Sequence, residues 1–107
     1  MALRRMTAET KRIVEAPHHV DVDNREEFGE MVSGVIEGLP AGAALVVDFA
    51  GTEFVDTAGL SILATIHTRA LDAQLSIQLI NVNEEIRASL ELARLDELFA
   101  IDGVSPS

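Results

Sequence analysis

A short apolar run near the middle of the chain constrains the fold more than any other feature. Residues 44–49 read Ala-Leu-Val-Val-Asp-Phe and follow a turn-forming stretch that contains Pro40 and Gly42. The run is too short for an ordinary helix, and apolar side chains at consecutive positions are typical of a strand that is buried on both faces of a sheet. We therefore predict that this segment is a buried central strand.

An amphipathic helix is predicted before this strand. Apolar residues recur at helical spacing from Phe28 to Ile36. Asp23 and Asn24 precede them as candidate N-cap residues, and Gly38 marks the expected end of the helix.

A second amphipathic helix is predicted to open at residues 56–60. Its apolar face is expected to consist of Leu60, Leu63, Ala64, His67, Ala70 and Leu71. Ile62 and Ile66 then fall on the opposite face, where they would either contact a partner or belong to a wider buried stripe.

Further segments complete the pattern. Residues 11–15 and 75–80 are predicted strands, and Asn83 is predicted to cap a third helix. Leu3 to Ala8 could pair with the first of these strands as an edge hairpin. The apolar cluster of residues 95–99 could form a separate helical turn, and the tail from Asp102 is expected to fray.

Strands that alternate with helices imply parallel strand pairs joined by right-handed crossovers. We therefore expect an α/β fold with a mixed central sheet of about four to five strands and helices packed on it. The chain has 107 residues, so we expect one domain that covers residues 1–107.

Composition narrows the classes of function. The formal net charge is −10, which repels nucleic-acid phosphates and anionic membranes but permits attraction to a basic protein surface. Without cysteine the chain forms no disulfide and no thiolate metal site, and His18 and His19 are adjacent and make a poor chelating pair. No apolar run approaches the ~18 residues of a membrane span. We expect a cytoplasmic protein that binds no nucleic acid, no metal and no cofactor.

The most informative segment begins where the central strand ends. The strand ends with Asp48, and eight residues later Asp-Thr-Ala-Gly-Leu at residues 56–60 opens a helix. This pattern resembles the signature of STAS domains, and so do Val20-Asp21 before the first helix and the closing pattern from Asn81-Val82 to Phe99. The resemblance covers nearly the whole chain. It implies a STAS-type fold of the kind found in stand-alone anti-sigma factor antagonists.

The resemblance also implies a site and its partners. In that family the hydroxyl residue beside the motif Asp is phosphorylated by a serine/threonine kinase that is also the anti-sigma factor, and a PP2C-type phosphatase resets it. Here Thr57 holds that position, and Ala58, which follows it, has no hydroxyl. The implied partner-binding residues are Asp21, Asp48, Asp56, Thr57, Gly59 and Ile62.

Simpler roles remain open for three of these residues. Asp56 or Thr57 could be only a helix N-cap, and Asp48 could cap a loop. The function implied by the resemblance is phosphorylation-controlled partner switching. A STAS accessory subunit of a lipid-transport ATPase is the alternative. An enzyme is not expected, because the sequence has no glycine-rich phosphate loop and no evident metal cluster.

Overall fold

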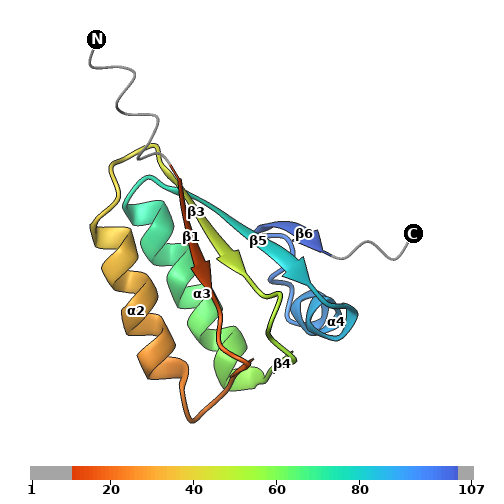
Figure 1. Ribbon diagram of the computed structural model, residues 1–107. Coiled ribbons are helices and arrows are strands. Elements are labelled where there is room, and N and C mark those ends of the chain that lie inside the picture. The colour runs from red at the N-terminus through yellow and green to blue at the C-terminus, as the bar shows by residue number, and fades with distance from the viewer. Residues whose placement is uncertain (1–10, 104–107) are drawn as a thin grey trace.

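The computed structural model describes residues 11–103, which form a sheet with helices packed against it (Figure 1). The strands are β1 (Lys11–Glu15), β2 (His19–Val20), β3 (Ala44–Asp48), β4 (Phe54–Val55), β5 (Ser76–Val82) and β6 (Ala100–Gly103). The helices are α2 (Arg25–Glu37), α3 (Thr57–Asp72) and α4 (Glu84–Leu92).

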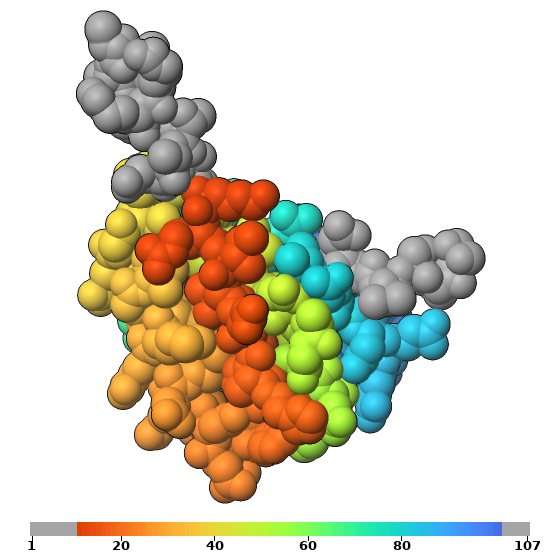
Figure 2. All heavy atoms as spheres, viewed as in Figure 1, coloured from red at the N-terminus to blue at the C-terminus, as the bar shows by residue number. Residues whose placement is uncertain are grey.

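The main sheet has the strand order β1-β3-β5-β6, and every neighbouring pair is parallel. One helix lies between each strand and the next, so right-handed crossovers in one direction place the helices on the same face. Figure 1 shows α3 behind the sheet and α2 beside β1 at the left, and in Figure 2 β1, β3 and β5 run across the visible surface. The predicted α/β fold is confirmed, but the four-stranded sheet of the described residues is parallel throughout and not mixed, because a helix crosses over between each pair of neighbouring strands. The expected edge hairpin of Leu3 to Ala8 lies outside the described residues.

The core lies between the sheet and the two long helices. Leu45, Val47 and Leu79 point from the central strands into this layer and are fully buried. They belong to one cluster with Val32 of α2 and Leu63 of α3. The predicted central strand is therefore confirmed as β3, between β1 and β5.

A second, two-stranded sheet was not expected from the sequence. β2 and β4 pair in parallel, with His19 opposite Phe54 and Val20 opposite Val55. Thr52 is buried beside them, and its hydroxyl donates a hydrogen bond of 2.7 Å to the carbonyl of Pro17. Strands of two residues have no periodicity to detect, which is why this element was missed. It joins the loops that follow β1 and β3 and thereby fixes the start of α3.

The N-cap of α2 differs from a simple sequence-based expectation. Asn24, and not Asp23, occupies the cap position, yet its side chain does not bind the first-turn amides. Instead its Oδ1 accepts a hydrogen bond of 2.9 Å from the amide of Asp21, and its Nδ2 donates one of 2.7 Å to the carbonyl of His19. The side chain therefore ties the helix start to β2.

The buried face of α3 is rotated from the predicted one. Gly59, Leu63, Ile66 and Ala70 are buried, whereas Leu71 is 57% exposed. The prediction was wrong for Leu71 because α3 packs against α2 as well as against the sheet, and α2 covers the flank that carries Ile66.

The C-terminal part of the chain also differs from expectation. Residues 100–103 form β6, which pairs with β5, so the predicted fraying from Asp102 is wrong as far as Gly103. The predicted separate turn is present as a single turn, in which the amide of Leu98 donates a hydrogen bond of 3.0 Å to the carbonyl of Leu95, and Phe99 is buried in the core beside the new strand. Asn83 caps α4 as predicted, because its Oδ1 accepts a hydrogen bond of 2.7 Å from the amide of Ile86.

Candidate partner-binding site

Asp56 anchors the start of α3 through both carboxylate oxygens. Oδ1 accepts a hydrogen bond of 2.8 Å from the amide of Gly59, which is an N-cap interaction. Oδ2 accepts one of 3.3 Å from the amide of Val22, in the loop between β2 and α2. The Asp56 amide itself donates to the carbonyl of Val20 at 3.1 Å. The carboxylate is thus a structural acceptor that holds the loop before α2 against the first turn of α3.

Gly59 allows the first turn of α3 to lie directly on β2. A Cβ at this position would lie 2.3 Å from the carbonyl oxygen of Val20 and 2.7 Å from Cγ1 of Val55. No side chain fits there without movement of the backbone. The structure gives Gly59 a packing role, and its contact with a partner stays a prediction.

Thr57 is the first residue of α3 and its side chain is exposed. Among residues 11–103 its hydroxyl has no hydrogen-bond partner, whereas Thr65 and Thr68 of the same helix each donate to a carbonyl one turn earlier, at 3.3 Å. A group added to Thr57 would lie at the amino end of a helix of 16 residues, where the helix dipole favours negative charge. The geometry therefore leaves Thr57 accessible and able to carry a phosphate without loss of an internal contact.

A shallow hollow lies beside Thr57, between the first turn of α3 and α4. The structure adds residues of α4 that were not predicted, above all Leu92, which is 88% exposed. A sequence signal existed, because Leu92 stands off the stripe of Ile86 and Leu90 that α4 buries. We call this area the Thr57 surface; it consists of Val55, Asp56, Thr57, Leu60, Ser89, Leu92 and Ala93.

Asp21 lies next to this surface, but its carboxylate accepts hydrogen bonds from amides of its own loop. Its Oδ1 accepts hydrogen bonds from the amides of Asp23 at 3.0 Å and Asn24 at 3.3 Å. Its Oδ2 lies 2.8 Å from Nδ1 of His19. The bond from Val22 to Asp56 holds this loop at the start of α3. The structure therefore brings Asp21, Asp56 and Thr57 together, as the resemblance implied.

Asp48 and Ile62 belong to other parts of the molecule. Oδ1 of Asp48 accepts hydrogen bonds of 2.9 Å from the amide of Ala50 and from Nδ2 of Asn81, which is the loop-capping role left open above. Ile62 is half-buried on the flank of α3 that faces α2, where its Cδ1 lies 2.8 Å from the position of a Cβ on Gly29. The six predicted residues thus do not form one continuous surface.

Within residues 11–103 no group of three or more His, Asp or Glu side chains is arranged to hold a metal ion. No helix in the same range is long and apolar enough to cross a membrane.

Comparison with known proteins places this geometry in a family. Residues 3–101 match the family described as "Mlab, STAS domain". A search of curated proteins finds no match.

Several solved structures share the fold. A putative anti-sigma factor antagonist from Thermotoga maritima superimposes with a TM-score of 0.76 at 18% identity, over 90% of this chain and 81% of the other. An anti-sigma-factor antagonist (STAS) domain protein from Planctomyces limnophilus gives 0.76 at 15% identity, over 87% and 82%. The murine solute carrier 26 family member A9, an anion transporter, gives 0.76 at 19% identity, over 91% of this chain but only 17% of the transporter.

These likenesses show a shared fold in stand-alone proteins and in a domain of a much larger transporter. Because the family match spans nearly the whole sequence, the chain belongs to the STAS domain family.

Proposed function

We propose that this STAS domain is a cytoplasmic anti-sigma factor antagonist that acts by binding and not by catalysis. In its unphosphorylated form it binds a serine/threonine kinase-type anti-sigma factor through the Thr57 surface, and the sigma factor is released. The observation that carries the proposal is the exposed, unbonded hydroxyl of Thr57 beside the exposed side chain of Leu92. Exposed apolar side chains beside a modifiable hydroxyl are suited to a partner contact that a charge can disrupt.

The switch is a transfer of the γ-phosphoryl group of ATP to Oγ1 of Thr57. The hydroxyl proton is lost and ADP leaves, and a PP2C-type phosphatase later hydrolyses the phosphoester. The phosphate adds about −1.5 to −2 charges at neutral pH. A partner that covers Leu92 and the neutral hydroxyl would have to desolvate that charge, so the phosphorylated form would be released.

Phosphorylation is compatible with the fold for two reasons. Thr57 makes no hydrogen bond in the described part of the chain that a phosphate would break, and the amino end of α3 favours an anion. The neighbouring Asp56 carboxylate opposes the new charge, but both of its oxygens already accept backbone amide hydrogens. The switch would thus change the surface and leave the core intact.

The test is incubation with ATP and the cognate anti-sigma kinase, followed by mass spectrometry of intact protein and peptides. One added phosphate at Thr57 is expected, with none in Thr57→Ala. Thr65→Ala is the matched control, because Thr65 is an exposed hydroxyl residue of the same helix. Absence of phosphate on Thr57 would contradict the switch.

The exposed Leu92 also favours a second candidate. A lasting contact with an ATPase subunit of a lipid transporter would use the same apolar surface without any phosphorylation. Stable co-purification with such an ATPase, lost in Leu92→Glu, together with no phosphate at Thr57, would favour this alternative.

A further inference from the structure

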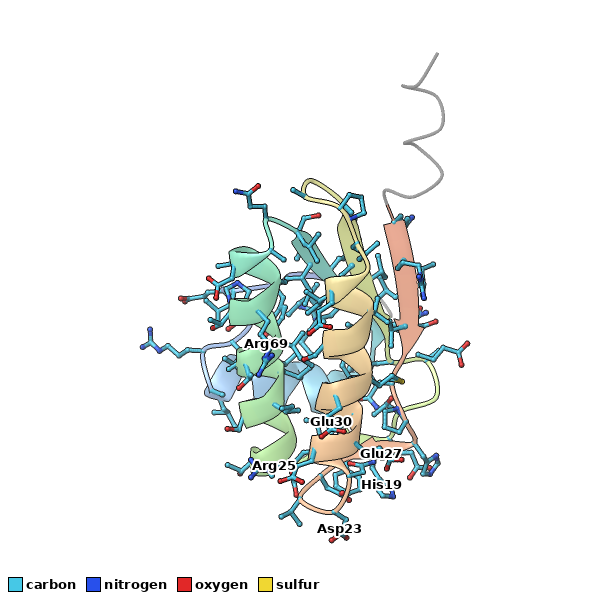
Figure 3. The ribbon with its side chains drawn as sticks, turned by 90° about the vertical axis from the view of Figure 1, so that its left-hand side faces the viewer. His19, Asp23, Arg25, Glu27, Glu30 and Arg69 are labelled. Carbon is cyan, nitrogen blue, oxygen red and sulfur yellow. The ribbon has the colours of Figure 1, made fainter. Side chains whose placement is uncertain are left out.

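The groove between α2 and α3 lies on the other flank of α3 from Thr57. It has a volume of about 600 Å³ and runs between the two helices. Figure 3 looks onto this face, where Glu30 of α2 and Arg69 of α3 lie along the line between the helices. The groove is open because two of its lining residues on α2, Gly29 and Ser33, are small. Ile62 of α3 makes its base partly apolar.

The α2 rim of this groove is acidic. Glu26, Glu30 and Glu37 are exposed and fall on one stripe of the helix, at spacings of four and seven residues. Among residues 11–103 the close ion pairs are His18–Glu53 and His19–Asp21, so none of these three carboxylates has a cationic partner within 4.0 Å there. Glu26 and Glu30 repel each other one helical turn apart, which is unfavourable for the isolated helix.

Gly34 is a second unexplained feature of the same groove. It stands in the interior of α2, where glycine is less favourable than alanine. A Cβ at this position would meet no atom within 4 Å, so packing within the described chain does not require glycine. A glycine on an open helix surface permits close approach of another backbone.

We propose that the α2–α3 groove binds a basic, amphipathic helix of a partner protein, at a site separate from the Thr57 surface. A third helix packs naturally into the furrow between two helices. The 13 residues of α2 extend for about 20 Å, which corresponds to three to four turns of a bound helix. Lys or Arg side chains of that helix would pair with the acidic rim, and its apolar side chains would contact Ile62.

A basic protein is a better occupant than another copy of this chain. Each copy carries a formal net charge of −10, so two copies repel each other. The same charge disfavours nucleic acid and anionic membranes. The acidic α2 rim instead attracts a cationic helix, and Gly34 admits its backbone. Arg69 on the α3 rim repels cations, so the Lys and Arg side chains of the bound helix would face α2.

The probe for this site is a fluorescein-labelled synthetic peptide of 16 residues in which Leu forms a helical stripe flanked by Lys and Arg. A scrambled isomer of the same composition controls for charge alone. Anisotropy titrations should give saturable binding that weakens with added salt, and at least about tenfold weaker binding of the isomer. Amide signals of Gly29, Ser33, Gly34 and Ile62 should shift in NMR spectra of the complex.

Variants distinguish binding in the groove from a general attraction of the basic peptide to the acidic protein. The double variant Glu30→Lys/Glu37→Lys and the single variant Gly34→Leu should each weaken peptide binding about tenfold or more. The double variant Glu91→Lys/Glu97→Lys, at exposed positions, changes the net charge by the same amount and should leave peptide binding within about twofold, because neither residue lines the groove. Thr57→Glu should also have no effect, which distinguishes this proposal from the proposed function.

Three outcomes would overturn the proposal. The first is equal binding of the peptide and its isomer, or binding that is indifferent to Gly34→Leu. The second is a dimer in sedimentation equilibrium that Gly34→Leu dissociates, because the occupant would then be a second copy. The third is a shift of groove amides in the unliganded Arg4→Glu/Arg5→Glu variant, because the occupant would then be the start of this chain.

Discussion

The two flanks of α3 are built in opposite ways. At its first turn, Gly59 lies so close to β2 that a Cβ would be 2.3 Å from the carbonyl oxygen of Val20. Across the α2–α3 groove, Gly34 has open space in which a Cβ would meet nothing within 4 Å. One glycine is explained by the fold and the other is not. The comparison shows that Asp56 and Gly59 position the backbone around Thr57. Gly34 in the groove, in contrast, has no packing role in the isolated domain.

The largest effect is expected for Gly59→Ala. The new Cβ would collide with backbone atoms of Val20, which cannot rotate away, so α3 would have to move from β2. Overpacking of this kind costs about 3 kcal/mol or more, and the melting temperature of a domain of this size should fall by roughly 15 °C. Thermal unfolding followed by circular dichroism measures it.

Gly51→Ala is the matched control for this substitution. Gly51 is exposed in the loop after β3, and a Cβ there would meet no atom within 4 Å. Its melting temperature should stay within about 2 °C of the parent. Similar stability of Gly59→Ala and Gly51→Ala would contradict the close packing of α3 on β2.

The second effect concerns binding at Thr57. Thr57→Glu should weaken the complex with the anti-sigma factor about a hundredfold, because an interface over this helix start would bury an unpaired carboxylate. Thr57→Ala should retain affinity. Folding should be unaffected in both, since an acidic residue in the first turn of a helix is mildly favourable. Titration calorimetry against the partner and thermal melts decide it. Equal affinity of the two variants would place Thr57 outside the interface.

The sequence predicted the fold well and the site in part, for reasons visible in single residues. β3 and the Asn83 cap carry strong local patterns, and both were predicted. The hydroxyl at Thr57 and the cap at Asp56 were readable because a motif of adjacent residues carries them. Leu92 was missed, because the Thr57 surface combines α3 with α4, and only tertiary structure brings those helices together.

Two residues that were predicted to bind a partner, Asp48 and Ile62, lie away from the Thr57 surface. Asp48 is the last residue of β3, as predicted, but its carboxylate accepts a hydrogen bond from Nδ2 of Asn81, near the end of the neighbouring strand β5. Ile62 follows Thr57 by five residues, so the helical period turns it by about 140° toward α2. Proximity in the sequence was therefore a poor guide to which residues share a surface.

The third effect tests the anchor at Asp56. Asp56→Ala removes the acceptor of two backbone amides and should cost about 1–2 kcal/mol of unfolding free energy. Asp56→Asn keeps an acceptor oxygen at the cap. Its free energy of unfolding should fall by only about 0.3 kcal/mol, because Asn is as good an N-cap as Asp. Urea denaturation of the three proteins gives the comparison. Equal losses for Ala and Asn would show that the negative charge, and not the cap geometry, stabilises this helix start.

The smallest effect, and the one with opposite sign, is expected for Gly34→Ala. Alanine is the better helix former by about 0.5–1 kcal/mol, and nothing in the described chain opposes its methyl group. The melting temperature should therefore rise by roughly 4 °C.

Gly29→Ala is the paired control in the same helix. Its Cβ would lie 2.8 Å from Cδ1 of Ile62, a side-chain end that can turn aside, so part of the helix-propensity gain should be lost to repacking. Calorimetric melts resolve differences of this size. A lower melting temperature for Gly34→Ala would mean that the open space at Gly34 is filled in the free protein, and the contrast between the two flanks of α3 would fail.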